Sequence, residues 1–529
     1  MSTWANGRFV ICTNVLLARF VSSGEPPFKG SHSPNKDGNP NPRELVTPLD
    51  GSSVNTNLTV AVESPVAPLE GKLASFRLIP RIETYPKVVS FVQTPLGKVV
   101  LLALFGLGLW ASMGDWLPLT LCLAAITFLP TKRRLLVSIC TLAFTFLVPR
   151  IHGSVPLSII ATFVQVFTLA ALFFWCAVLW PRSLYGRRPV VFLLCTFSAF
   201  IVLGTILSKN ERAYTLLWQF LFIFATYVWF IGYSLLDANS PKHDNFGLQL
   251  GAYSPFWGSS NTPFPKGASY LRQIEARDAE QLAVTQLKGL KLLAWSLLIL
   301  MGLRWSYSFF HEHLGIPTFA EALKLSVHGQ PLPWYGCWGG LIFSFFMGLM
   351  SVSATGHRIV ACCRMAGFNA LRNTYRPLSS VTVAEFFNRY YYYFKELLVD
   401  FFFYPTFLRY FKKSPKLRMA AAIFAAACFG NAFYHFTASL DFVRTYGLWH
   451  ALVSFQVYFF YCALLAAALT ISNLRRRKKV YAGFLRSRLL PATSVIFFYC
   501  LLDVFGSSEH KYPLIEHFRF FGHLFFLNF

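Results

Sequence analysis

The chain has 529 residues, of which 55% are hydrophobic, 17% are aromatic and only 13% are charged, and its formal net charge is +25. This composition is typical of a polytopic membrane protein and excludes an ordinary soluble two-domain enzyme, which would carry about twice that charge fraction. The positive charge does not indicate nucleic-acid binding, because the Lys and Arg residues mostly flank apolar runs, where membrane topology explains them. The 11 cysteines lie mostly inside apolar runs, so neither a disulfide framework nor a bound metal is predicted.

Residues 1–90 differ in composition from the rest of the chain. The stretch 22–71 is rich in Pro, Ser, Asn and Gly. It cannot bury enough apolar surface to offset the entropy lost on ordering. We therefore expect a disordered polar N-terminal segment.

Apolar runs of membrane-spanning length then follow one another. The predicted fold is all-α, with about 11 transmembrane helices. The predicted spans are 98–114, 116–131, 134–149, 156–180, 189–207, 213–235, 290–310, 335–355, 417–436, 446–472 and 488–505. The chain is accordingly divided into N-terminal transmembrane helices at 91–235, a cytoplasmic loop at 236–289, a core at 290–510 and a C-terminal tail at 511–529.

Two connecting regions are expected to be more than turns. Residues 268–289 carry apolar side chains among charges, which predicts an amphipathic helix on the cytoplasmic face. Residues 361–415 lie between the eighth and ninth spans and are too polar to span and too aromatic for a plain loop, which predicts interfacial or re-entrant helices. Basic clusters at 132–134, 182–188, 358–364, 412–418 and 475–479 define the expected cytoplasmic side.

Two histidines, His435 and His450, lie in apolar surroundings near the ends of consecutive predicted spans. Asn431 precedes His435 by four residues, so the two share a helix face. Ionisable residues at membrane depth are costly and are functional hypotheses by default. A neutral imidazole there could act as a general base toward a hydroxyl, and the alternative is a pair of structural histidines hydrogen-bonded to neighbouring spans.

The motifs that precede these histidines occur in a characteristic order. They are RMAGF at 364–368, NTYRPL at 373–378, EFFNRY at 385–390 and DFFFYP at 400–405, and YGLWH follows at 446–450. This order resembles the membrane-bound O-acyltransferase (MBOAT) family, nearest to its alginate O-acetylase and D-alanyl transfer branches. The resemblance covers about 290–475 and implies a polytopic helical enzyme.

Spacing within the resemblance favours His435 over His450 as the catalytic histidine. His435 follows Asp400 by 35 residues, as the family's first histidine element does, and GLWH at 447–450 matches the second element. The chain departs from the family at Tyr391, where Asn, Asp or His is usual, and Asn388 lies one helical turn earlier and offers a polar group instead.

The resemblance implies transfer of an acyl group from a thioester donor such as acyl-CoA to a hydroxyl acceptor. The expected acceptor is a cell-surface glycan, and a lipid alcohol is the alternative. His435 would then take the hydroxyl proton, and the groups that orient the acceptor or the oxyanion would be Asn388, Tyr391 or Asn431. The cations expected to bind the donor phosphates are Arg364, Arg376, Arg389 and Lys395. Anchoring by the positive-inside rule explains each of these cations equally well. Asp400 and Asn373 are assigned structural polar roles, and Asp400 is expected to pair with an Arg or Lys.

A second class of function remains open from the sequence. The chain could be a non-catalytic membrane carrier or an MBOAT-like scaffold. The expected partners are membrane lipids, the acyl donor, the hydroxyl acceptor and, by resemblance, a secreted or periplasmic protein. The expected location is the plasma (inner) membrane, with the endoplasmic reticulum membrane as the alternative.

Overall fold

The computed structural model describes residues 78–114, 116–146, 157–209, 211–240, 243–259, 262–475, 483–506 and 512–527. Within these ranges the regular structure is helical, without a β-strand, and one isolated bridge joins Glu275 to Phe368. The all-α prediction is confirmed for this part of the chain. Most of the polar segment predicted at 1–90, up to residue 77, lies outside the described residues, as do residues 476–479 of the last basic cluster.

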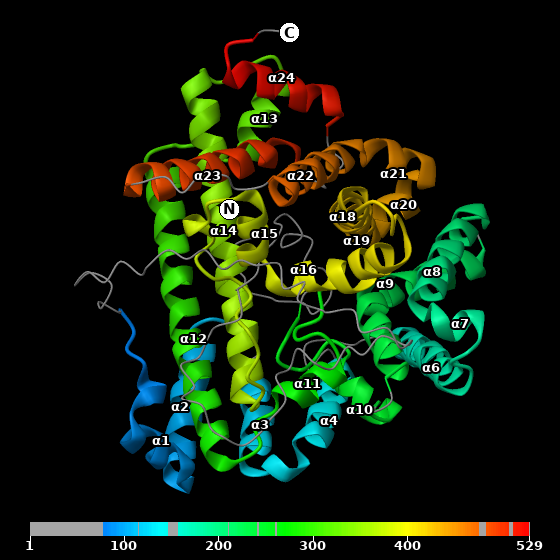
Figure 1. The fold of residues 1–529 in the computed structure, drawn as a ribbon, viewed down its shortest axis with the longest axis vertical. Helices are drawn as coiled ribbons and strands as arrows, with labels where there is room; N and C mark the ends of the chain where they lie inside the picture. Colours follow the sequence, from blue (N-terminus) through cyan, green and yellow to red (C-terminus); the bar gives the residue numbers. More distant parts are fainter. Residues whose placement is uncertain are drawn as a thin grey trace.

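The first four helices gather at one end of the molecule (Figure 1). They are α1 (Pro86–Gln93), α2 (Pro95–Trp110), α3 (Trp116–Phe128) and α4 (Arg133–Phe146). A bend of 99° separates α1 from α2. Thr94 ends α1 and its hydroxyl caps α2 by accepting from the Gly97 amide at 3.0 Å. The bend requires glycine there, because a Cβ on Gly97 would lie 1.9 Å from the Phe91 carbonyl oxygen.

A second group of helices lies to one side in Figure 1. It consists of α6 (Leu157–Leu179), the short α7 (Leu184–Arg187), α8 (Pro189–Ile206) and α9 (Arg212–Ala238). α9 packs against both α6 and α8, and the Trp218 indole donates to the Gly204 carbonyl at 3.2 Å across the α8 contact. After α9 come α10 (Phe246–Gln249) and a buried loop that leads to α11 (Ala268–Ile274).

Two long helices, α12 (Ala279–Ser306) and α14 (Trp334–Met365), run side by side through the molecule (Figure 1). A π-helical turn, Tyr307–His313, extends α12, and α13 (Phe319–Val327) lies between the two in the chain. The prediction of an amphipathic helix over 268–289 is wrong, because two helices share this range. α11 ends at Ile274 and α12 starts at Ala279, because Asp278 caps a new helix by accepting from the Gln281 amide at 2.7 Å.

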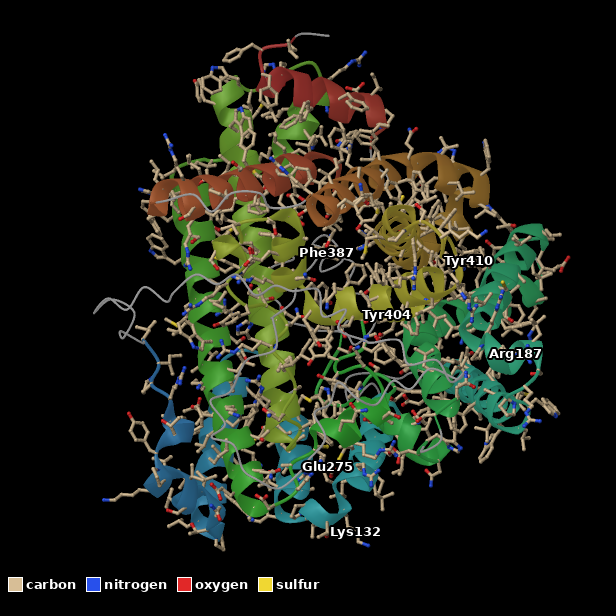
Figure 2. The ribbon with its side chains drawn as sticks, in the orientation of Figure 1. Lys132, Arg187, Glu275, Phe387, Tyr404 and Tyr410 are labelled. Atoms are coloured by element: carbon tan, nitrogen blue, oxygen red, sulfur yellow. The ribbon has the colours of Figure 1, made fainter. Side chains whose placement is uncertain are left out.

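The predicted interfacial region is built of short helices near the middle of the molecule. α14 ends at Met365, and α15 (Val383–Tyr390), α16 (Tyr392–Leu398) and α17 (Tyr404–Arg409) follow, with a π-helical segment at Val399–Phe403. In Figure 2, Phe387 on α15 and Tyr404 on α17 both lie above Glu275 and Lys132. At 1.5 Å rise per residue, none of these helices reaches across a bilayer of ~30 Å.

The remaining helices complete the opposite end. They are α18 (Pro415–Phe424), α19 (Asn431–Thr437), α20 (Leu440–Tyr446), α21 (Leu448–Ser454), α22 (Gln456–Leu474), α23 (Leu490–Leu502) and α24 (Leu514–Leu524). A π-helical segment, Ala425–Gly430, joins α18 to α19, and another, Leu485–Leu489, precedes α23. The α18–α19 unit packs against α22.

Eight helices of the described chain are long and apolar enough to cross a membrane, which indicates a multi-pass membrane protein. They are Ile159–Leu179, Pro189–Ile206, Arg212–Ala238, Ala279–His313, Trp334–Met365, Pro415–Thr437, Gln456–Leu474 and Leu485–Phe505, with α1–α2 as a ninth if the bent pair is one span. The count of about 11 is not confirmed. α3 has 13 residues and α4 has 14, about 20 Å each, because the basic turn at Lys132 and Arg133 separates them.

Buried apolar side chains form two clusters. One joins α6, α8 and α9 to α13, the upper part of α14, α15, α16 and α18–α24, and the other joins α1–α4, the loop before α11, α12 and the lower part of α14. α14 contributes Leu349 and Val352 to the first and Ile359 and Val360 to the second. The expected N-terminal unit 91–235 therefore contributes to both clusters.

Candidate functional site

His435 and Asn431 lie on one face of α19 and are both buried. Tyr458 of α22 donates its hydroxyl to Asn431 Oδ1 at 3.3 Å, and its ring centroid lies 4.5 Å from that of His435. Two further polar atoms, His435 Nδ1 and Asn431 Nδ2, are buried and have no hydrogen-bond partner among the described residues. Leaving such groups unpaired costs about 1–3 kcal/mol each. An unpaired imidazole nitrogen and an unpaired amide on one helix face are an arrangement that a polar ligand would satisfy.

Tyr434, which precedes His435, and Tyr391 share one hydroxyl partner. Tyr434 and Tyr391 both contact Thr262 Oγ1, at 2.9 and 3.3 Å respectively. Tyr391 lies at the break between α15 and α16, where its φ of −141° and ψ of 78° interrupt the helix. The Phe394 ring, one turn later on α16, lies 5.9 Å from the His435 ring. The loop before α11 thus joins the α15–α16 corner to the histidine helix.

His450 occupies a different environment. It lies on α21, is exposed, and its ring is 6.2 Å from Phe442 and 5.9 Å from Tyr446. His435, by contrast, is enclosed by aromatic rings of α16 and α22. Asn388 is half-buried on α15, the helix that precedes Phe394. Of the acceptor-side residues expected from the sequence, the structure brings His435 and Asn431 together. Tyr391 is linked to their neighbour Tyr434 through the Thr262 hydroxyl.

The four cations expected on the donor side occupy three places. Arg364 lies in the last turn of α14, and its Nε donates to the Ala370 carbonyl at 2.8 Å. Arg389 contacts Glu385 at 2.7 Å and donates to Ser379 Oγ at 2.7 Å, and that hydroxyl in turn donates to the Arg376 carbonyl at 2.8 Å. Arg376 and Arg389 are therefore neighbours.

Lys395 belongs to a buried charge network that also contains Asp400. Lys266, from the loop before α11, contacts Asp400 at 2.9 Å and also contacts Glu396, which pairs with Lys395. The Tyr233 hydroxyl donates to the same Asp400 oxygen at 2.9 Å. Asp400 thus has a lysine partner, and that partner comes from a segment about 130 residues earlier in the chain.

Burial and charge act in opposite directions on this network. Burial alone would raise the pKa of Glu396, but Lys395 and Lys266 outweigh it and hold that pKa at about 2. Burial raises the pKa of Asp400 even though Lys266 opposes the change. Burial would lower the pKa of Lys266, but Asp400 and Glu396 raise it well above its ordinary value. The network is therefore held by charge pairing that compensates for desolvation.

Another polar pair near the lower half of α14 was not expected from the sequence. His357 of α14 is buried, and its Nδ1 has no hydrogen-bond partner in the described part of the chain. Asn373 packs against Gly356, the residue before His357. The Asn373 Nδ2 likewise has no hydrogen-bond partner in the described part of the chain. The Asn373 carbonyl accepts from the Tyr392 amide at 2.9 Å, which ties the NTYRPL turn to α16. His357 lies between Gly356 and Arg358, just beyond the predicted span 335–355, and no capping or spacing signal marks it.

His435 offers a buried imidazole in uncharged surroundings, next to the Asn431 amide and the Tyr458 phenol. No group of three or more metal-ligating side chains occurs in the described ranges. A cavity of about 460 Å³ lies elsewhere, at the start of α12, and neither His435 nor Asn431 lines it. Comparison of the chain with models of protein families and with curated proteins gave no match.

Proposed function

We propose that this protein is a membrane-bound O-acyltransferase in which His435 is the general base. The observation that supports this most is the pair of buried, unpaired polar atoms on α19, His435 Nδ1 and Asn431 Nδ2. A catalytic base needs a lone pair that no neighbouring side chain already uses. The motif order that resembles the MBOAT family supports the same residue by spacing.

In the proposed reaction the acceptor hydroxyl gives its proton to His435 as its oxygen attacks the thioester carbonyl. The tetrahedral intermediate then collapses and expels the thiolate, which takes up the proton. Asn431 and Tyr391 supply polar groups that orient the acceptor or donate to the oxyanion, and Asn388 lies on the adjoining helix.

The proposed donor is an acyl thioester such as acyl-CoA. Arg376 lies in the NTYRPL turn, and Arg389 of α15, which also pairs with Glu385, reaches Ser379 beside it, so these two arginines are the proposed partners of the donor phosphates. The proposed acceptor is a cell-surface glycan, with a lipid alcohol as the alternative. The proposed location is the plasma (inner) membrane, or else the endoplasmic reticulum membrane, with a secreted or periplasmic protein as a further partner.

The test compares two histidine variants in membranes that contain equal amounts of protein. Mass analysis of surface glycans and lipids, with and without the protein, first identifies the acylated product. His435→Gln is expected to lower the initial rate of acyl transfer to that product by ~10²–10⁴-fold. His450→Gln is the matched control and is expected to leave the rate nearly unchanged, because its ring is exposed.

Full activity of His435→Gln would refute the assignment, and loss of activity in His450→Gln alone would move the base to His450. If no acylated product depends on the protein at all, the non-catalytic role is favoured. The enclosure of the His435 ring by Phe394, Tyr434 and Tyr458 would then be structural packing.

A further inference from the structure

The cavity at the start of α12 is lined by charged side chains of both signs. It measures about 460 Å³ and lies where α1, the start of α2, the turn before α4 and the link between α11 and α12 meet. Cations outnumber anions in its lining, which includes Lys98, Arg133, Arg272, Arg277, Glu275 and Asp278. None of these residues belongs to the His435 site.

The two acidic side chains already have partners inside the protein. Glu275 contacts Arg133 at 3.3 Å and Arg134 at 3.5 Å. Asp278 accepts from the Gln281 amide at the start of α12. Glu275 and Asp278 offset two of the four lining cations, so the lining of the cavity keeps a net positive charge of two.

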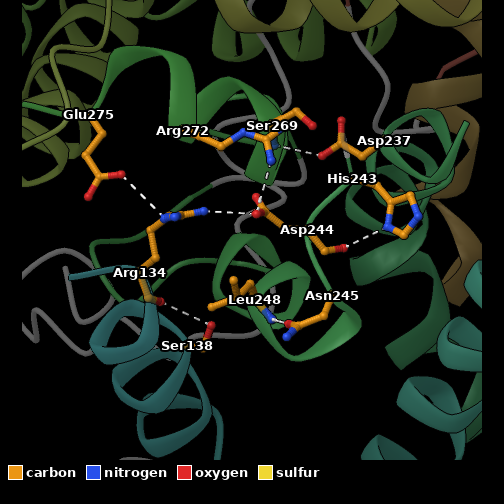
Figure 3. A network of polar contacts seen from close by, with 10 residues as sticks. All are labelled: Arg134, Ser138, Asp237, His243, Asp244, Asn245, Leu248, Ser269, Arg272 and Glu275. Carbon is orange, nitrogen blue, oxygen red and sulfur yellow. Dashed lines mark hydrogen bonds and ion pairs between the residues drawn. The ribbon is translucent and has the colours of Figure 1, made fainter. Parts of the chain in front are cut away.

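The positions of the inner cations are set by a polar network (Figure 3). Asp244 contacts Arg134 at 2.9 Å and Arg272 at 3.2 Å, and this arrangement holds Arg272 and Glu275 at the cavity wall. Arg133 is buried with a side-chain exposure of 2%, and its Nε has no hydrogen-bond partner in the described residues. Prearranged guanidinium groups match phosphate oxygens in geometry and charge.

The start of α12 adds to this field. α12 has 28 residues, and its first backbone amides have no acceptor within the helix. The helix dipole places partial positive charge at that end. Ala279, the first residue of α12, lines the cavity. The Asp278 carboxylate already accepts from one of these amides, and the other amides of the first turn add to the attraction of the guanidinium groups for an anion.

The outer rim of the cavity adjoins apolar surface. Gln93 and Lys98 line the cavity on either side of the α1–α2 bend. Between and beside them, Phe91, Leu96 and Val99 are exposed, Leu96 by 66%. Exposed apolar side chains on a bent helix pair next to cations are typical of a segment at the membrane interface.

We propose that this cavity binds a phosphate group, supplied by the headgroup of an anionic phospholipid whose acyl chains lie along α1 and α2. The phosphate contacts Lys98 and Arg277 at the rim and the inner guanidinium groups behind them. This inference does not depend on acyl transfer by His435.

The test uses the full-length protein purified in detergent. Binding of short-chain phosphatidylglycerol and of phosphatidylcholine is measured by native mass spectrometry and by the shift in unfolding temperature. Lys98→Gln/Arg277→Gln removes two rim cations, and Lys412→Gln/Lys413→Gln removes two exposed cations whose neighbours in the chain do not line the cavity. The two double variants thus lose the same charge.

Phosphatidylglycerol is expected to bind more tightly than phosphatidylcholine. The rim variant is expected to weaken phosphatidylglycerol binding by roughly 30-fold, and the control variant by less than about threefold, because its charges act only at a distance. Equal unfolding temperatures of the two variants without lipid would show that the loss is one of binding.

Equal binding of the two lipids, or equal weakening in both variants, would overturn the proposal. Inorganic phosphate and glycerol 3-phosphate form the second arm of the experiment. If either binds as tightly as phosphatidylglycerol and depends on the same rim cations, the lipid source is overturned and a soluble phosphate compound takes its place.

Discussion

Replacing Lys266 by methionine removes a cation that contacts both Asp400 and Glu396. The three side chains are only 17%, 19% and 16% exposed, so water restores little of the lost interaction. Breaking a buried ion pair on one side costs about 3–5 kcal/mol, because the other charge stays buried and unpaired. Glu396 keeps Lys395 and Asp400 keeps Tyr233. We therefore expect Lys266→Met to lower the free energy of unfolding by about 3 kcal/mol, the lower end of that range.

The measurement is the unfolding midpoint in a denaturant titration. Unfolding is monitored by the fluorescent labelling of cysteines that are buried in the folded protein. Lys412→Met, at an exposed lysine before α18, is the matched control and should change the free energy by less than about 0.5 kcal/mol. Lys266→Met/Asp400→Asn should recover about 1 kcal/mol or more of the loss, since it removes the unpaired charge as well. A loss below about 1 kcal/mol in the single variant, as for a surface pair, would refute the reasoning.

Three further changes probe packing, hydrogen bonding and pH dependence. Gly356→Ala would bring a Cβ to 2.7 Å from Asn373 Nδ2 and should cost about 1–3 kcal/mol in the same titration, whereas Gly302→Ala, with nothing within 4 Å, should be neutral or stabilising; equal effects would contradict the close approach. Thr262→Val removes the hydroxyl that two tyrosines share and should cost about 1–3 kcal/mol, and Thr262→Ser should restore most of it. The pKa of Glu396 is held at about 2, below its ordinary value, so its contribution to stability is present above pH ~4.5 and is lost as the pH falls toward 2. Glu396→Gln should flatten that part of the curve of unfolding temperature against pH, and an unchanged slope would contradict the charge pairing.

The helices that the sequence predicts well are those with long apolar runs between clear stops. The spans predicted at 156–180, 189–207 and 213–235 match α6, α8 and α9 to within a few residues. The spans predicted before residue 150 also lie within about four residues of α2, α3 and α4, but α3 and α4 are too short to count as membrane spans, because hydropathy alone does not fix where a helix ends. The same limitation applies at 268–289, where apolar spacing continues across two helices that Asp278 separates.

In the candidate site, too, local periodicity predicts some contacts and long-range packing sets the others. Asn431 and His435 are four residues apart, so helical periodicity alone places them on one face. Thr262 and Lys266 could not be predicted, because the loop that carries them has no periodicity and its contacts cross more than 120 residues of chain. Tyr458 is a similar case, since only the packing of α22 against α19 brings its hydroxyl to Asn431.

α14 is a rod of 32 residues, about 48 Å long, whose two ends are anchored in different apolar clusters. Its anchorage changes from one cluster to the other between Val352 and Ile359. The residues between them include Ser353, whose hydroxyl donates back to the Leu349 carbonyl at 2.8 Å, and Gly356, which has no side chain. Back-bonded serines and glycines are where helices bend most readily. If one end of the molecule moves against the other, we therefore expect α14 to bend in this turn.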